Sequence, residues 1–139
     1  MPANLEGIHI LVVDDDQDIL TSVRIAYENA GAKVSIANDG AKGLDAARRL
    51  APDLVILDMM MPRKSGFVVI ESLKQNAQPG DKPHVIMITA NEGKRHEAYA
   101  RHLGVDEYVN KPFATERLIE IAARLFEREY VDPDRSQVY

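Results

Sequence analysis

The stretch LVVDDDQDIL (residues 11–20) joins an apolar run directly to three consecutive aspartates, Asp14, Asp15 and Asp16. Like charges side by side repel each other, and carboxylates at the edge of a core lose hydration. A short apolar run is typical of a buried strand, whereas residues 17–30 place apolar side chains at helical spacing. The stretch therefore predicts a strand, an acidic turn and a helix.

The same alternation continues along the chain. Short runs rich in Val and Ile predict strands, and amphipathic segments between them predict helices. The predicted strands are 8–13, 33–37, 54–58, 84–89 and 107–109, and the predicted helices are 17–30, 40–51, 65–76, 92–103 and 115–128. Strands that are apolar throughout and alternate with helices favour a parallel sheet covered on both faces. The predicted fold is a doubly wound α/β domain, (βα)5 and flavodoxin-like, with a five-stranded parallel sheet and helices on both faces.

Composition excludes several classes of protein. The 139 residues suit one domain, and 17 Lys+Arg against 22 Asp+Glu give a net charge of −5, which disfavours direct nucleic acid binding. The absence of cysteine excludes disulfides and thiolate metal sites. No apolar run approaches the roughly 18 residues of a membrane span, and the first residues lack the pattern of a signal peptide. We therefore expect a cytoplasmic protein without membrane contact.

Polar side chains follow most of the predicted strands, where each strand ends. Asp14 and Asp15 end the first strand, Asp58 ends the third, Thr89 ends the fourth, and Lys111 follows the fifth. Because ligands of open parallel sheets bind beyond the carboxyl ends of the strands, we expect these side chains to form one site. Oxygen ligands without His or Cys at ligand spacing favour a hard cation, Mg²⁺ with Mn²⁺ as the alternative.

The same residues suit phosphoryl chemistry. A carboxylate held against Mg²⁺ is a potential nucleophile, and aspartyl phosphates are known covalent intermediates. Lys111 offers a positive charge and Thr89 a hydroxyl donor to phosphoryl oxygens. The pattern therefore predicts that an aspartate of this site accepts a phosphoryl group.

Other residues have simpler interpretations. Asp16 precedes the first helix, so an N-cap role is sufficient for it. Met59 is expected to pack in the core. The histidines do not group with the carboxylates in the predicted topology, and we interpret them as surface or strand-end residues: His9, His84, His96 and His102.

Four segments together resemble the signature segments of two-component response-regulator receiver domains, of the chemotaxis-regulator type. They are ILVVDDD (10–16), LVILDMMMPRKSGF (54–67), VIMITA (85–90) and DEYVNKPF (106–113). The resemblance extends over residues 7–127, which we take as the domain. Residues 128–139 are predicted to form a polar tail or the start of a linker.

The resemblance implies a role for each matching position. Asp58 would be the phosphoacceptor, and Asp14, Asp15, Asp58 and the backbone carbonyl of Met60 would hold the metal. Thr89 and Lys111 would contact the phosphoryl group. Tyr108 would be the aromatic switch residue that turns inward with Thr89, and the peptide bond between Lys111 and Pro112 would be cis.

The resemblance also implies a signalling function. A sensor histidine kinase or phosphotransfer protein would donate the phosphoryl group, and the surface over residues 92–129 would then change for an output partner or output domain. A phosphorylation-dependent homodimer is one such arrangement, with charges for cross-pairing at Arg101, Asp106, Glu107 and Arg124. The protein would not be a classical enzyme, although it would catalyse its own phosphorylation and dephosphorylation.

Two alternatives remain open at this stage. The first is a phosphate-independent interaction module of the same fold. The second is a Mg²⁺-dependent phosphatase or phosphotransferase that acts on small molecules through Asp58. Such enzymes usually need a lid and an acid–base aspartate two residues after the nucleophile, where this chain has Met60.

Overall fold

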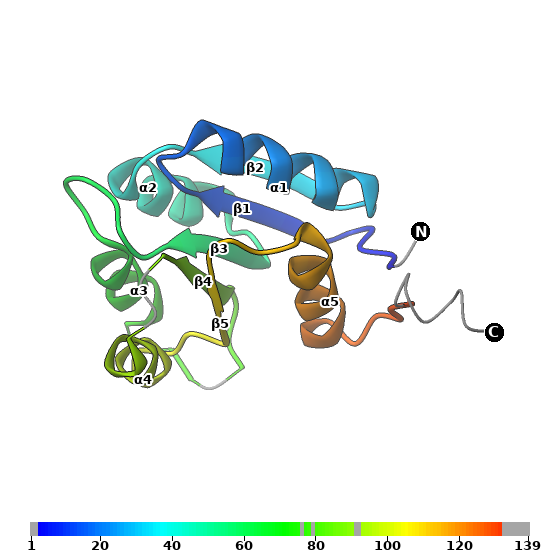
Figure 1. Ribbon diagram of the computed structural model, residues 1–139. Coiled ribbons are helices and arrows are strands. Elements are labelled where there is room, and N and C mark those ends of the chain that lie inside the picture. The colour runs from blue at the N-terminus through cyan, green and yellow to red at the C-terminus, as the bar shows by residue number, and fades with distance from the viewer. Residues whose placement is uncertain (1–2, 76, 79, 91–92, 132–139) are drawn as a thin grey trace.

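The structure, a computed structural model, describes residues 3–75, 77, 78, 80–90 and 93–131. Its strands are β1 His9–Val13, β2 Lys33–Ala37, β3 Leu54–Asp58, β4 His84–Thr89 and β5 Glu107–Asn110. Its helices are α1 Gln17–Asn29, α2 Gly40–Leu50, α3 Gly66–Lys74, α4 Lys94–His102 and α5 Thr115–Leu125. The strands form one parallel sheet in the order β2-β1-β3-β4-β5, which confirms the predicted doubly wound fold (Figure 1). No helix in the described part of the chain is long and apolar enough to cross a bilayer.

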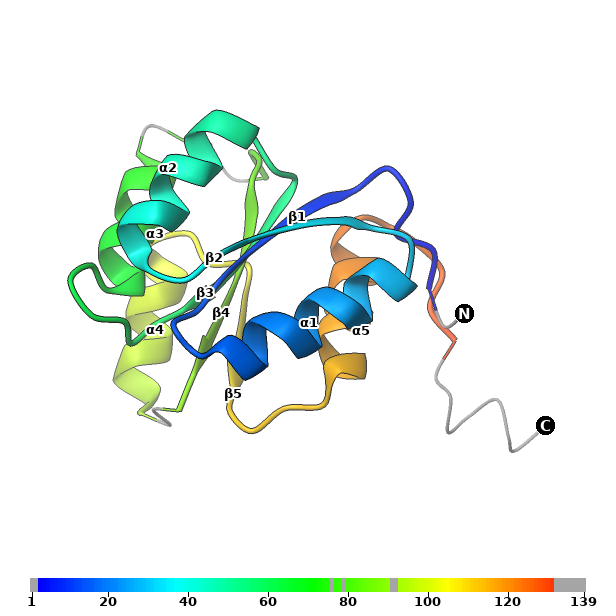
Figure 2. The same ribbon diagram turned by 90° about the horizontal axis from the view of Figure 1, so that it is seen from above.

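Helices cover both faces of the sheet because successive strand residues point to opposite faces. Along β1, Ile10 and Val12 lie in one buried cluster with α1 and α5, whereas Leu11 and Val13 lie in a second cluster with α2, α3 and α4. The two layers of helices are separated by the sheet in the view from above (Figure 2). The continuous apolar strands therefore supply side chains to two cores, one on each face of the sheet. The carboxyl ends of the strands lie along one edge of the sheet, between the two layers of helices.

The ends of the helices differ slightly from the predicted ranges. The side chain of Asp16 accepts hydrogen bonds from the backbone N–H groups of Asp18 and Ile19, so its predicted N-cap role is confirmed. Helix α2 ends one residue early because Ala51 adopts a left-handed conformation with φ of 47°. Helix α5 ends at Leu125 rather than at 128, since the chain turns at Glu127, where φ is 53°.

Two predicted helix boundaries, at residues 76 and 92, lie outside the described residues. Strand β5 is one residue longer than the predicted strand 107–109, because it pairs with β4 as far as the Thr89–Asn110 pair. The side chain of Met59 is 1% exposed, which confirms its predicted core position.

The two ends of the described chain contact each other beyond the predicted bounds of the domain. Ala3 and Tyr130 form an antiparallel bridge, and Leu5 is fully buried in the cluster beneath α1 and α5. Part of the predicted tail at 128–139 therefore packs against the N-terminal segment, while residues 132–139 lie outside the described structure.

Candidate functional site

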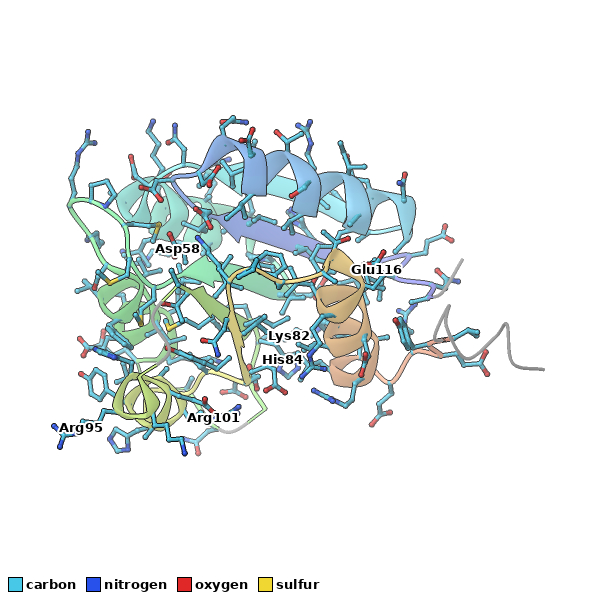
Figure 3. All side chains as sticks on the ribbon, in the orientation of Figure 1. Asp58, Lys82, His84, Arg95, Arg101 and Glu116 are labelled. Atoms are coloured by element: carbon cyan, nitrogen blue, oxygen red, sulfur yellow. The ribbon has the colours of Figure 1, made fainter. Side chains whose placement is uncertain are left out.

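Two aspartates lie almost fully buried at the carboxyl ends of adjacent strands. Asp14 follows β1 and is 0% exposed, and Asp58 ends β3 and is 3% exposed. Asp15 is exposed beside them, and each of the three offers a carboxylate oxygen within 4.8 Å of the others. Asp58 lies at the strand edge between the helical layers (Figure 3). The sheet topology thus brings together carboxylates from positions far apart in the sequence.

Asp14 and Asp16 have separate local roles in the acidic turn. One carboxylate oxygen of Asp14 accepts a hydrogen bond from the backbone N–H of Asp16 at 2.9 Å. This bond holds the turn between β1 and α1 closed, so that Asp16 can cap the helix. Among the hydrogen bonds of the described residues, Asp15 neither closes the turn nor caps the helix. Its exposed side chain lines an open cleft beside the carboxylates.

Lys111 supplies the positive charge of the site. Its Nζ lies 3.1 Å from Asp14 Oδ2 and 3.5 Å from Asp58 Oδ1. Its backbone N–H donates to the carbonyl oxygen of Thr89 at 2.7 Å, which fixes the β5–α5 loop against the end of β4. The Lys111–Pro112 peptide bond is cis. One ammonium therefore faces two buried carboxylates, so negative charge exceeds positive charge in the site.

Burial is the main cause that raises the pKa values of the two buried acids, and neighbouring negative charge adds to it. Burial raises the pKa of Asp58 to about 6, the charge of Asp14 adds to the rise, and Lys111 opposes it. Burial also raises the pKa of Asp14, against the backbone N–H of Asp16 and the charge of Lys111. Both carboxylates would be better satisfied if another cation lay beside them.

The donor set fits a hard cation. Asp14 Oδ2 is buried without a hydrogen-bond partner, although Lys111 lies within ion-pair distance of it. An open cleft of about 320 Å³ leads to the carboxylates and is lined by Asp15, Asp16, Asp58, Met60, Ala90 and Lys111. Oxygen ligands and room for water molecules are the environment that Mg²⁺ prefers. The residues present therefore suit the expected metal, and Mn²⁺ has the same ligand preferences.

The backbone around Met60 is held next to the acids. Its N–H donates to Asp58 Oδ1 at 3.3 Å, and its side chain is 64% exposed over the cleft. Gly66 closes the β3–α3 loop by donating its N–H to the carbonyl oxygen of Met59 at 2.9 Å. The main chain at position 60 is thus fixed while its side chain faces solvent.

Thr89 and Tyr108 are buried neighbours on β4 and β5. Thr89 is 0% exposed and Tyr108 is 9% exposed. Burial raises the pKa of Tyr108, while a hydrogen bond to Thr89 opposes that rise. The phenol O–H also donates to Met59 Sδ at 3.8 Å. The predicted switch residues are therefore in contact, with the tyrosine ring directed inward.

Sequence reasoning missed two features of the site. Ala90 lines the cleft because it directly follows the predicted strand-end residue Thr89, a position that could have been inferred from the strand boundary. The contact between Tyr108 of β5 and Met59, just after β3, joins residues on either side of β4, and no pattern in the sequence indicates it.

The fold and the site together define a class of protein. A doubly wound α/β domain with buried carboxylates and a lysine at the carboxyl ends of its strands offers oxygen ligands and a positive charge at the edge where such folds bind their ligands. Residues 10–123 match the response regulator receiver domain family. The chain therefore belongs to this family, which serves phosphorylation-dependent signalling in two-component systems.

Individual relatives agree with this assignment. The DNA-binding dual master transcriptional regulator RpaA of Synechocystis sp. is 38% identical over 119 residues, which cover 86% of this chain and 49% of that protein. A CheY-like receiver domain protein of Methanospirillum hungatei superposes with a TM-score of 0.78 at 30% identity, covering 86% of this chain and 94% of the other. The Francisella response regulator 1452 receiver domain gives a TM-score of 0.79 at 28% identity, covering 87% and 98%. The chain spans about half the length of the curated relatives it matches.

Proposed function

We propose that Asp58 is the phosphoacceptor of this receiver domain. The supporting observation is its burial at the end of β3, beside Asp14 and within 3.5 Å of Lys111. A carboxylate oxygen of Asp58 would bond to phosphorus while the bond from phosphorus to the donor's imidazole nitrogen breaks. The donor would be a sensor histidine kinase or a phosphotransfer protein. Its imidazole leaves with the electron pair of the broken bond.

We propose Asp14, Asp15, Asp58 and the backbone carbonyl of Met60 as the protein ligands of Mg²⁺. When bound, the ion offsets the repulsion between these acids and the incoming phosphoryl dianion. Lys111 would hold one phosphoryl oxygen, and the proximity of its Nζ to both buried carboxylates supports this role. The Thr89 hydroxyl would donate to another oxygen. In this sense the domain catalyses its own phosphorylation and dephosphorylation.

Intact-mass measurement after incubation with acetyl phosphate tests this proposal. We expect the gain of one phosphoryl group with Mg²⁺ present, and none after chelation or in Asp58→Asn. Asp45→Asn is the matched control, since that carboxylate is exposed on α2 and 79% of its side chain is accessible. Labelling of Asp58→Asn at the rate of the parent protein would place the phosphoryl group elsewhere.

The same measurement separates the alternatives. A phosphate-independent interaction module of this fold would gain no phosphoryl group under any condition. A phosphatase of small molecules would release phosphate from many esters at steady state and would not accumulate the labelled protein. Met60 stands two residues after Asp58 and supplies no acid–base carboxylate, which disfavours the small-molecule phosphatase.

We propose that phosphorylation is transmitted through Thr89 and Tyr108 to the surface over residues 92–129. Thr89 would move toward the phosphoryl group and draw the Tyr108 ring further inward, so that the population of surface conformations shifts. NMR spectra of Tyr108→Phe and Thr89→Ala with and without phosphorylation test this link. We expect the shifts in α4 and β5 to be reduced in Thr89→Ala, and unchanged shifts would contradict it.

We further propose that this surface binds an output partner or output domain in the cytoplasm, without direct contact of this chain with nucleic acid. Homodimerisation is one form that the contact can take. Arg101 and Arg124 both pair with Glu107 within the chain, at 3.0 and 2.7 Å, so cross-pairing would require exchange of these partners. Asp106 is likewise engaged by the backbone N–H of Val85. Sedimentation velocity of phosphorylated and unphosphorylated protein tests the dimer, and identical monomers would exclude it.

A further inference from the structure

The turn between β2 and α2, residues 37–40, touches both halves of the proposed metal site. At one end, the carbonyl oxygen of Ala37 accepts a hydrogen bond from the backbone N–H of Asp14 at 3.2 Å. At the other end, Gly40 packs directly against the main chain of Lys64 in the β3–α3 loop. The turn therefore spans the gap between the acidic pair after β1 and the loop that carries Met60.

The contact at Gly40 leaves no room for a side chain. A Cβ atom built there would lie 2.3 Å from the carbonyl oxygen of Lys64, 3.0 Å from its Cβ and 3.1 Å from its carbonyl carbon. A carbon and an oxygen in ordinary contact lie about 3.3 Å apart or more. A methyl group at Gly40 would thus displace helix α2 or the loop by about 1 Å. Because the obstacle is backbone, no side-chain rotation can relieve it.

Asp39 holds the same junction by polar contacts. One carboxylate oxygen accepts the backbone N–H of Lys42 at 2.7 Å and caps helix α2, while the other lies 3.7 Å from Nη1 of Arg63. Asp39 is 8% exposed, so its charge is largely shielded from water. The start of α2 thus contacts the loop at residues 63 and 64, closely at Lys64 and through an exposed, weak ion pair at Arg63.

Displacement at Lys64 would reach the metal ligands because the loop is short and closed. The Lys64 N–H donates to the carbonyl oxygen of Pro62 at 2.8 Å, and the Gly66 N–H donates to that of Met59 at 2.9 Å. A loop closed at both points moves as a unit, so a shift at Lys64 would carry the peptide of Met60 with it. The backbone of Arg63 adopts a left-handed φ of 69°, which is strained for a residue with a side chain.

We propose that Gly40 is a positioning residue for the metal site, because its missing side chain lets the 37–40 turn set the separation between the acidic pair and the Met60 carbonyl. The inference rests on the proposed metal ligands. Mg²⁺ requires near-octahedral geometry at about 2.1 Å, whereas Ca²⁺ accepts more ligands in flexible arrangements. Gly40→Ala should therefore weaken Mg²⁺ binding much more than Ca²⁺ binding.

Isothermal titration of both ions into parent protein, Gly40→Ala and Ala47→Gly tests the inference. Ala47 is buried on the same helix away from the loop, so its replacement loosens α2 without moving Lys64. We expect Gly40→Ala to raise the Mg²⁺ dissociation constant about tenfold, the lower range for residues that orient metal ligands. Its Ca²⁺ constant should change by about twofold at most. Ala47→Gly should leave the ratio of the two constants at the parent value.

Each other result overturns the inference. Parent-like Mg²⁺ affinity in folded Gly40→Ala shows that the glycine does not position the ligands, and equal loss of both ions shows a general structural role. Failure of the parent itself to bind Mg²⁺ overturns the proposed metal site as well. This result is distinguishable from failure of the Gly40 inference alone, in which the parent binds Mg²⁺ normally. If Gly40→Ala does not fold, Lys64→Gly and Gly40→Ala/Lys64→Gly repeat the comparison with a more adaptable loop. Equal Mg²⁺ affinity of that pair refutes the positioning role.

Discussion

Replacing Asp58 by asparagine is expected to stabilise the metal-free protein at neutral pH, although it removes the proposed phosphoacceptor. The pKa of Asp58 is raised from 3.8 to about 6, because burial and the charge of Asp14 outweigh the attraction of Lys111. The ionised carboxylate therefore costs free energy in the folded protein. Asparagine keeps the shape of the side chain and an oxygen for the N–H of Met60, and Lys111 keeps its contact with Asp14.

The size and sign of the effect follow from the two pKa values. Between pH 3.8 and about 6 the folded protein holds a proton on Asp58 that the unfolded chain has lost. Stability therefore falls as pH rises through this window. A difference of about 2 pKa units corresponds to about 3 kcal/mol, fully present above about pH 7 and nearly absent at about pH 4. Asp58→Asn should thus gain about 2–3 kcal/mol at neutral pH and less than about 1 kcal/mol in acid.

Urea unfolding in the presence of a chelator measures this difference. The free energies of unfolding of parent and Asp58→Asn are compared at about pH 7.5 and about pH 4, where the pH-dependent terms of groups that do not interact with Asp58 cancel in the difference. Asp45→Asn should differ from the parent by no more than about 0.5 kcal/mol at either pH, since Asp45 is exposed on the surface. An equal gain at both pH values, or a loss at the higher one, would refute the electrostatic reasoning.

Three further substitutions test local interactions that stabilise the fold. Tyr27→Phe should lower the free energy of unfolding in urea by about 1–2 kcal/mol, because the buried hydroxyl donates to the Leu118 carbonyl oxygen at 2.8 Å. The control Tyr99→Phe, whose hydroxyl is exposed, should lower it by less than about 0.5 kcal/mol. Asp16→Ala should cost about 1 kcal/mol by removing the cap of α1, without changing labelling by acetyl phosphate at saturating Mg²⁺. Leu5→Ala should lower the unfolding free energy by about 2–5 kcal/mol, because the side chain is fully buried, and a change below about 0.5 would show that the N-terminal segment does not belong to the folded unit.

The strands and the grouping of the acids were predictable because both depend on patterns that are local in the sequence. Continuous apolar runs indicate strands buried on both faces, and a parallel sheet then brings their ends to one edge. Asp14, Asp58 and Lys111 could be placed together for this reason, before any distance was known. The roles of individual ligands depended instead on resemblance to a family, since spacing alone does not distinguish a nucleophile from a metal ligand.

Features that arise from packing between distant elements could not be predicted. The approach of Gly40 to Lys64 depends on how α2 packs beside the β3–α3 loop. A glycine in the first turn of a helix does not by itself indicate such a contact. Helix ends were misplaced for a related reason. At Ala51 the following Pro52 does indicate that the helix ends, although not at which residue. Glu127 is left-handed without being a glycine, so the sequence gives no stop signal there.

The aspartates at and beside the acidic turn meet two demands that oppose each other. Asp16 stabilises the fold as a cap, whereas Asp14 and Asp58 destabilise it in the absence of a cation. A cost of about 3 kcal/mol that a bound cation relieves corresponds to about two orders of magnitude in the binding constant of that cation. Asp58→Asn should therefore gain stability and lose Mg²⁺ affinity together. Removal of a residue that served only packing would lower both, so opposite signs in one variant would identify the acids as a binding device.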